Sequence, residues 1–444
     1  SLLELNTVTF SGIKLSPTSE AKGIVHIKYN NSEFIAQSCI FENINISSKG
    51  GNAIRIVDSV SNPIVATINA CEFNNISSIG DSSGRGGSAI FMKSKYGSKL
   101  IIDESSKFTK CIVDKGNGGA IYIETDFDSE FEFNIINATI SKCEAKADTT
   151  KDIPPTGYGG GIMLVGTGDY IASSERLDLH GMKIYDNNAT KKGQSLYVVM
   201  PKLASWCRFG SLGEFVKGNY SDLTSYEPDL QGIISNRETF IGYTSIQISS
   251  DTYNLEDYWR VLTDNAKLYV RSDGNDDLFC TQSIPCKTLD AYHISNNINI
   301  PHLYQVYIID SSSIDYKAEI TQTSSARTYG PLDNESTTVR NLLIETGGQF
   351  DVEGKILFNY INFVVQATSL SNGQHTIQGL KSTTTEISLM NCQYHMASSG
   401  ISIGKSLVCM LKGGTQTITN LTVSDITSVE NVIKAEFDES GTLT

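Results

Sequence analysis

One short motif recurs along the first half of the chain and constrains its fold more than any other feature. In each copy, glycine or a small polar residue precedes a run in which two aliphatic residues flank one variable residue. The clearest copy, residues 118–123, reads Gly-Gly-Ala-Ile-Tyr-Ile, and further copies begin at Gly23, Gly50, Gly86, Gly159 and Gln194. Apolar residues at every second position indicate a strand with one buried face. Each copy is therefore expected to form a short strand.

A second motif precedes the glycine motif in each period. It starts with Phe or Ile and ends three residues later with Ile, Cys or Asn, and successive copies start 31, 32, 35, 32 and 44 residues apart. The copies start at Phe10, Phe41, Phe73, Phe108, Ile140 and Ile184. A third strand-like run, such as residues 100–103 or 130–135, lies between the two motifs. Three short strands per period, without helical spacing, predict an all-β parallel β-helix rather than propeller blades, which are usually longer and carry four strands.

The repeat also predicts which residues stack. In a parallel β-helix each strand pairs with its equivalents in the coils above and below, about 4.8 Å away, so residues one period apart form columns. Ile54, Ile90, Ile121 and Ile162 are expected to share one interior column. Asparagines at the turns tolerate the left-handed conformation and can form a ladder. These asparagines are Asn43, Asn74, Asn75, Asn187 and Asn188.

The clear repeats end near residue 200, which predicts a first β-helix with a period of about 32 residues over residues 1–200. Residues 81–86 and 147–158 interrupt the repeats as insertions on one edge of the coil. Residues 201–265 lose the pattern. We interpret them as degenerate coils and a junction, with a short helix near residues 256–263.

Strand-like runs resume at residue 268 and predict a second β-helix over residues 266–444. Its first part, residues 266–295, combines a strand, a loop rich in Asp and Gly, a small loop between two cysteines and a helix that opens near Thr288. We interpret this part as an N-terminal cap, because the open edge of a first coil would otherwise pair with other chains. The chain begins within a strand-like run and ends just after another, residues 432–437, which favours a longer or processed protein.

The chain has nine cysteines, and none of them forms a Cys-x-x-Cys pair. This spacing argues against a zinc cluster. Cys280 and Cys286, separated by a short turn, are the predicted disulfide. The odd count leaves at least one thiol free or paired with a segment outside this chain.

Four other cysteines occupy equivalent repeat positions in neighbouring coils. Cys39 and Cys71 share one position, and Cys111 and Cys143 share another. Stacked coils either bring each pair within reach of a disulfide or leave both residues as buried, small apolar groups. The sequence leaves these two alternatives open.

Charge and composition limit the partners. The formal net charge is −14 and the pI is about 4.9, which argues against a nucleic-acid partner because no basic stripe is present to replace counterions. No apolar run is as long as the ~18 residues that a membrane span needs. Eight Asn-x-Ser/Thr sequons are candidate glycosylation sites. They are Asn30, Asn45, Asn75, Asn137, Asn188, Asn219, Asn334 and Asn420.

The alternating motifs resemble those of polymorphic outer-membrane-type proteins, in which a Gly-Gly-Ala-Ile element alternates with a Phe-x-x-Asn element. Residues 118–121 match the first element in full, and residues 131–134 match the second. This resemblance covers residues 1–200. Residues 268–291 resemble the first coil of pectate-lyase-like right-handed β-helices. The resemblance implies a right-handed coil and a cell-surface or secreted setting, often adhesive, in bacteria and in microbial eukaryotes.

Lyases and hydrolases with this fold carry acidic clusters on an outer strand face, with Arg or Lys nearby, and the repeats show no such cluster. Arg55 is alone in its column, and the six histidines share no motif. Gly-x-Ser-x-Gly, His-Glu-x-x-His and phosphate-loop motifs are also missing. Residues 273–277 offer the oxygen ligands of calcium but lack the spacing of an EF-hand, so a solvated turn is the preferred interpretation. No catalytic residue, no metal and no cofactor is therefore predicted.

The variable position of the glycine motif points away from the buried face. In four successive copies it is occupied by Phe91, Tyr122, Met163 and Tyr197. Stacked exposed side chains of this kind would form an apolar stripe, and such stripes often bind partners. We expect a lateral-contact surface here. The alternative is that a local loop, such as residues 147–158, covers the stripe.

These features together predict a non-enzymatic extracellular protein with a structural or adhesive role. The expected molecule is a glycosylated β-helical rod that assembles, with itself or with other surface proteins, into a filament or coat. The alternatives are a polysaccharide lyase or hydrolase on the same fold, or a β-helix that binds glycans without turnover.

Overall fold

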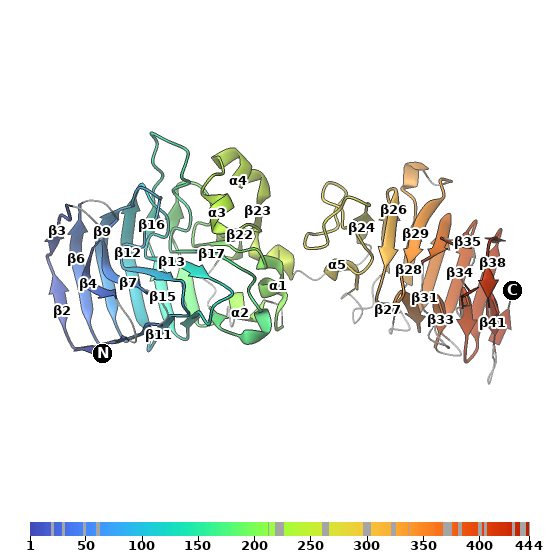
Figure 1. Cartoon of the computed structure of the whole chain (residues 1–444), viewed down its shortest axis with the longest axis horizontal. Coiled ribbons are helices and arrows are strands. Elements are labelled where there is room, and N and C mark those ends of the chain that lie inside the picture. Colours follow the sequence, from blue (N-terminus) through green and yellow to red (C-terminus); the bar gives the residue numbers. More distant parts are fainter. Residues whose placement is uncertain are drawn as a thin grey trace. The chain divides into compact units, whose positions relative to one another are not determined.

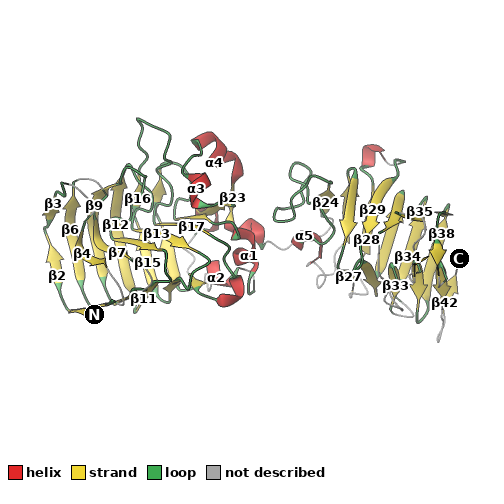
Figure 2. Cartoon of the chain, viewed as in Figure 1, coloured by secondary structure: helices red, strands yellow, loops and turns green. Residues whose placement is uncertain are grey.

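The structure is a computed structural model, and it describes residues 1–18, 22–28, 32–47, 50–58, 63–211, 213–217, 226–259, 266–295, 303–320, 326–335, 337–366, 375–380, 384–397, 402–403, 406–428, 431–435 and 441–443. The chain forms a parallel β-solenoid of about 11 turns. It divides into two compact units, Ser1–Arg260 and Val261–Thr444 (Figure 1). The prediction of a parallel β-helix is confirmed, and strands dominate each unit (Figure 2).

The first unit has three parallel sheets, and most coils give one strand to each sheet. Sheet A consists of β1 (Leu2–Asn6), β5 (Glu33–Gln37), β8 (Val65–Asn69), β11 (Lys99–Asp103), β14 (Glu132–Ile135) and β18 (Leu177–Asp178). Sheet B consists of β2 (Thr9–Ser11), β6 (Ile40–Ile46), β9 (Glu72–Ile79), β12 (Ser106–Asp114), β15 (Ala138–Ser141) and β19 (Met182–Tyr185), with the short strands β3 (Lys14–Leu15), β16 (Glu144–Ala145) and β20 (Asn188–Ala189) at its side.

Sheet C contains the glycine motifs. It consists of β4 (Gly23–Lys28), β7 (Asn52–Val57), β10 (Ile90–Ser94), β13 (Ile121–Asp126), β17 (Ile162–Thr167), β21 (Leu196–Val199), β22 (Leu230–Ile233) and β23 (Thr252–Asn254), of which only β23 is antiparallel to its neighbour. Ile54, Ile90, Ile121 and Ile162 are direct neighbours in register, and all four are completely buried. The predicted interior column is confirmed.

Gly118 shows why glycine precedes these strands. It lies three residues before the first residue of β13, with a φ of +68°. A Cβ there would collide with the backbone carbonyl oxygen of Ile121. Gly87, Gly159 and Gly193 hold the same place before β10, β17 and β21, each with positive φ. The turn into sheet C therefore needs a residue without a side chain.

The asparagine prediction is confirmed only in part. Asn43 and Asn75 have φ values of +53° and +54°, and the Asn75 amide donates to the Asn43 carbonyl at 2.8 Å. Further along the same column, Asp186 takes the left-handed conformation instead of Asn187. The Asn187 side chain is buried, where it accepts from the backbone N–H of Cys143.

Helices replace the coil pattern at the end of the first unit. They are α1 (Leu203–Arg208), α2 (Glu214–Lys217), α3 (Arg237–Phe240) and α4 (Ser245–Asp251), and short 3-10 turns cover Ala172–Ser174, Glu227–Asp229 and Leu255–Tyr258. A short helix was expected near residues 256–263. The structure has the 3-10 turn at Leu255–Tyr258, and residues 260–265 lie outside the described part of the chain.

The second unit repeats the three-sheet plan. Sheet D consists of β24 (Lys267–Val270), β25 (Leu303–Ile308), β28 (Ala326–Gly330), β31 (Lys355–Asn359), β34 (Glu386–Met390), β38 (Gly414–Thr419) and β42 (Gly441–Leu443). Sheet E consists of β26 (Ser311–Ile314), β29 (Arg340–Ile344), β32 (Ile361–Val365), β35 (Gln393–Met396) and β39 (Thr422–Val423). Sheet F consists of β27 (Lys317–Ile320), β30 (Gln349–Val352), β33 (Ile377–Gly379), β37 (Val408–Met410) and β41 (Ile433–Ala435). A separate pair joins β36 (Ser402–Ile403) to β40 (Thr427–Ser428).

The start of the second unit contains the predicted disulfide, between Cys280 and Cys286. Both cysteines belong to one buried apolar cluster with Leu268 and Val270 of β24. The helix expected near Thr288 is α5 (Tyr292–Ser295), one turn later in the chain. Among the described residues, none of the helices has the length and apolar character that crossing a membrane requires.

Candidate functional site

The predicted aromatic stripe exists, but it is not exposed. Phe91, Tyr122, Met163 and Tyr197 are neighbours in register on the outer face of sheet C. Their exposed fractions are 1%, 5%, 1% and 0%. The rings of Phe91 and Tyr122 stack with centroids 5.7 Å apart. The expectation of an exposed lateral-contact stripe is therefore wrong.

Three segments cover the stripe, and together we call them the lid: residues 147–158, α3 and α4. Tyr158 lies over the stripe with its ring centroid 5.0 Å from that of Tyr197 and 5.8 Å from that of Phe240 in α3. Ile248 of α4 belongs to the same buried cluster. Covering by the loop was the alternative interpretation of the sequence, and the two short helices complete it. The outer face of sheet C thus carries a second hydrophobic core.

A buried carboxylate fixes the lid to the sheet. Glu124 on β13 is 6% exposed and forms ion pairs with three cations. Its oxygens lie 2.6 Å from Nε of Arg85, 2.9 Å from Nε of Arg237 in α3 and 3.1 Å from Nζ of Lys93. Burial alone would raise the pKa of Glu124, but the neighbouring Arg85, Arg237 and Lys93 lower it to about 2. Glu124 is therefore ionised at neutral pH and holds α3 in place.

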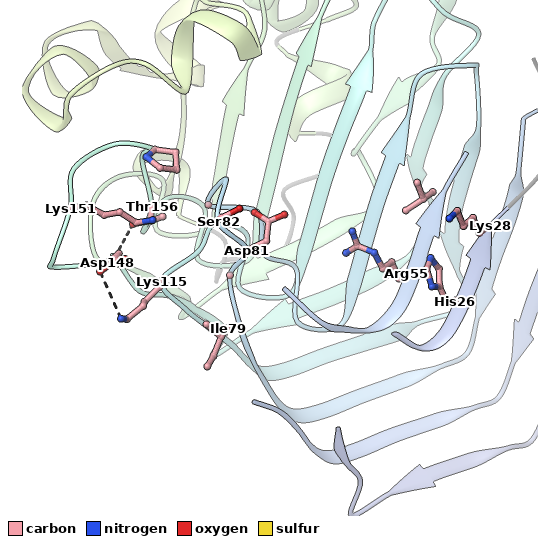
Figure 3. A pocket seen from close by; sticks show the side chains of 14 residues that line it. His26, Lys28, Arg55, Ile79, Asp81, Ser82, Lys115, Asp148, Lys151 and Thr156 are labelled. Atoms are coloured by element: carbon pink, nitrogen blue, oxygen red, sulfur yellow. Dashed lines mark hydrogen bonds and ion pairs between the residues drawn. The ribbon is translucent and has the colours of Figure 1, made fainter. Parts of the chain in front are cut away.

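Beside the lid, the outward column of sheet C continues as Arg55 on β7 and His26 on β4. There it forms one wall of an open groove of about 730 Å³ (Figure 3). The Arg55 guanidinium lies 4.0 Å from the ring centroid of Phe91, and its Nη1 donates to Oδ1 of Asn52 at 2.8 Å. The aromatic ring and the amide hold this cation in one orientation at the mouth of the groove.

The groove is rich in basic side chains. Figure 3 shows His26, Lys28 and Arg55 on the strands of one side, facing Lys115 and Lys151 on the other. This second side comes from the turn around Asp81, from Lys115 and from the loop part of the lid. The groove therefore spans several coils and gathers positive charge on a chain whose net charge is −14.

Two carboxylates also line the groove. Both accept hydrogen bonds within their own turns, and Oδ1 of Asp148 also lies 3.9 Å from Nζ of Lys115. Oδ1 of Asp81 accepts from the backbone N–H groups of Ser83 and Arg85, at 2.8 and 3.0 Å. Oδ1 of Asp148 accepts from the hydroxyl and the N–H of Thr150, and these bonds lower the pKa of Asp148. A carboxylate with a lowered pKa, as in Asp148, is a weak proton acceptor. The groove thus offers mainly positive charge to a ligand.

The structure places the other predicted sites apart from this groove. Asp276 accepts from the backbone N–H groups of Lys287 and Thr288, at 2.7 and 2.8 Å, so this carboxylate supports a turn. Within the described ranges, no group of three or more His, Cys, Asp or Glu side chains is arranged to hold a metal ion.

Five of the eight sequon asparagines can be located, and all five are exposed: Asn45, Asn75, Asn137, Asn188 and Asn420. Asn30 and Asn219 lie outside the described residues, as does the side chain of Asn334. Exposure is compatible with glycosylation, which stays a prediction.

No known protein family matches this chain, and no curated protein matches it. The resemblance to polymorphic outer-membrane-type proteins therefore rests on the motifs alone.

The sequence analysis did not predict the groove, although residues on both of its sides belong to recognisable features of the sequence. His26 and Arg55 occupy the variable position of their copies of the glycine motif, and residues 81–86 and 147–158 are the insertions on one edge of the coil. Because coil edges stack, the two insertions had to lie beside that column.

Proposed function

We propose that this protein is an extracellular adhesive scaffold whose first unit binds anionic glycans in the basic groove. The substrate class is a polysaccharide that carries carboxylate or sulfate groups, held without chemical turnover. The observation that carries the proposal is the convergence of His26, Lys28, Arg55, Lys115 and Lys151 on one groove, whose two carboxylates accept hydrogen bonds from their own turns.

The shape of the groove favours an extended ligand. Lys28 and Arg55 come from adjacent strands of sheet C, whose spacing is about 4.8 Å, so the cations follow the direction in which the coils stack. A chain lying along this direction would meet several cations in succession. The guanidinium of Arg55 presents paired donors that suit carboxylate and sulfate oxygens.

Three features support the extracellular setting. They are the resemblance described above, the Cys280–Cys286 disulfide and the exposed sequons. Disulfides persist mainly in oxidising compartments. Assembly into a filament or coat stays a prediction, and the buried stripe no longer supports it because the lid occupies that surface.

Binding of dextran sulfate and polygalacturonate, with neutral dextran for comparison, tests the proposal by titration calorimetry. The double variant Lys28→Glu with Lys151→Glu places two negative charges in the groove, and we expect at least a tenfold loss of affinity. The matched control, Lys14→Glu with Lys183→Glu, makes the same charge change at exposed positions on β3 and β19. Equal losses in both variants, or no binding by the unmodified protein, would refute the proposal.

A polysaccharide lyase or hydrolase is the second candidate, because Asp81 and Asp148 share the groove with Arg55 and Lys115. The hydrogen bonds from Thr150, which lower the pKa of Asp148, favour binding over proton abstraction. Incubation with polygalacturonate, with detection of unsaturated or reducing ends, separates the two functions. Product formation that is lost in Asp148→Asn would establish turnover and replace the binding proposal.

A further inference from the structure

Two pairs of cysteines lie in register on neighbouring coils of sheet B. Ile40 pairs with Glu72, so Cys39 and Cys71 immediately before them are also opposite one another. Ile112 pairs with Glu144, which places Cys111 opposite Cys143 in the same way. All four side chains are buried, with exposed fractions of 0% or 1%.

The second sulfur of each pair lies between the two coils, whereas the first is turned to the coil before its own. The thiol of Cys39 donates to the Leu5 carbonyl at 3.4 Å, and that of Cys111 donates to the Phe73 carbonyl at 3.8 Å. Sγ of Cys71 accepts from the backbone N–H of Cys39 at 3.4 Å, and its thiol donates to the Ala36 carbonyl of the preceding coil at 3.3 Å. The thiol of Cys143 likewise donates to the carbonyl of Phe108 in the coil of Cys111, at 3.7 Å. In both pairs the second cysteine therefore directs its sulfur towards the coil that carries the first.

The backbone already has the spacing that a bridge needs. Neighbouring parallel strands are about 4.8 Å apart, and the Cα atoms of disulfide-bonded cysteines are usually about 4.4–6.8 Å apart. The structure holds all four cysteines as free thiols. A bridge needs rotation about χ1 and a slightly closer approach of the two Cβ atoms, because these atoms are usually about 3.5–4.5 Å apart in a disulfide.

We propose that Cys39 and Cys71, and likewise Cys111 and Cys143, form disulfides that join adjacent coils of the first unit. Each bridge forms when two thiols lose two protons and two electrons to a disulfide oxidant, such as oxidised glutathione, which is reduced to two thiols. Both bridges span 32 residues of sequence, since 71 − 39 and 143 − 111 are each 32. Each therefore ties one coil to the next.

Oxidation has to occur while the chain folds. Burial raises the pKa of Cys71 to about 12, and burial together with Cys143 raises the pKa of Cys111 well above its usual value. The thiolate is the reactive form, so the thiols of the folded protein react slowly. An oxidant that is present during folding meets them before they are enclosed.

Cys392 in the second unit is a matched internal control. It follows a left-handed residue, Asn391, as Cys39 follows Ser38, and its thiol donates to the Phe358 carbonyl of the preceding coil at 3.5 Å. Its neighbours in register are Ile361 and Leu421. Cys392 thus has the same environment without a cysteine above or below it.

Counting thiols tests the proposal. The full chain is refolded in a buffer of reduced and oxidised glutathione, denatured, alkylated and weighed by mass spectrometry. Of nine cysteines, two belong to the Cys280–Cys286 disulfide, which leaves seven, and two further bridges leave three. We expect three alkylated residues: Cys207, Cys392 and Cys409. A larger count, or peptide maps that link other partners, would overturn the proposal.

Variants give a second readout that does not depend on ligand binding. Cys39→Ala with Cys71→Ala should leave the count at three, because it removes two bridged residues, whereas Cys392→Ala should lower it to two. If the paired cysteines were free thiols, the double variant would instead lower the count from seven to five. Because glycan binding is measured separately, the bridges and the proposed function can fail independently.

Discussion

A single carboxylate, Glu124, joins the lid to the solenoid, and its charge should make that junction sensitive to pH. Its pKa is lowered from 4.5 to about 2 in the folded protein. The contribution to stability is therefore fully present above pH ~4.5 and is lost as the pH falls towards 2. The shift corresponds to roughly 3 kcal/mol at neutral pH. We expect Glu124→Gln to lose about this much unfolding free energy, and to flatten the dependence of stability on pH between about 5 and 2.

Glu132→Gln is the control for this prediction, measured by denaturant unfolding across the same pH range. Glu132 pairs with Lys99 at 2.7 Å, but the two side chains are 19% and 42% exposed. Pairs of this kind contribute less than about 1 kcal/mol. Equal effects in the two variants would show that Glu124 has no special role.

At the glycine before β13, the cost of the left-handed backbone conformation can be separated from the cost of a steric contact. Gly118 and Gly12 have nearly the same φ, +68° and +69°, but a Cβ has no neighbour within 4 Å at Gly12 and meets the Ile121 backbone at Gly118. Gly12→Ala should cost about 1–2 kcal/mol for the left-handed conformation alone. Gly118→Ala should cost clearly more, because the turn into β13 must also shift. Equal losses in denaturant unfolding would mean that the contact does not matter.

At the scale of elements, the coils were predictable because a residue's spatial neighbours are its equivalents one period away. The alternation in residues 118–123 therefore predicts a strand, and the repeat predicts the strands that pair with it. The lid follows no such rule. Helices α3 and α4 have four and seven residues, too few to show helical periodicity. Phe240 packs on Tyr158 and Tyr197, which no local pattern connects to it.

The lid should detach without unravelling the coils. Phe240 is 2% exposed within the lid, and Phe240→Ala should remove about 3–5 kcal/mol of packing. We expect faster amide hydrogen exchange in residues 147–158, α3 and α4, with unchanged protection in β13, whose hydrogen bonds run between coils.

Ile246→Ala in α4 is the control for the lid, because Ile246 is 81% exposed and should change stability by less than about 0.5 kcal/mol. A uniform rise in exchange across sheet C after Phe240→Ala would contradict the prediction. It would show that the lid and the coils unfold as one cooperative unit.

At the scale of the whole molecule, charge is distributed unevenly. The net charge therefore did not predict a basic groove. The net charge of −14 describes the chain as a whole and does not show where the cations lie. Lys28, Arg55, Lys115 and Lys151 are separated by 27 to 60 residues, since 55 − 28 is 27, 115 − 55 is 60 and 151 − 115 is 36. They meet only because the coils stack and two insertions fold over one edge. Charge patterns within short segments of the sequence cannot predict such a site.

The two units have separate cores, and this division predicts two unfolding transitions. The cluster that contains Cys280 and Cys286 includes only residues of the second unit, whereas Glu124 and the lid core belong to the first. Replacing both Cys280 and Cys286 by Ala opens a short loop and should cost about 2 kcal/mol. In calorimetry it should lower the temperature of one transition only, and Glu124→Gln should lower the other. If both variants shifted a single transition, the two units would unfold as one cooperative unit.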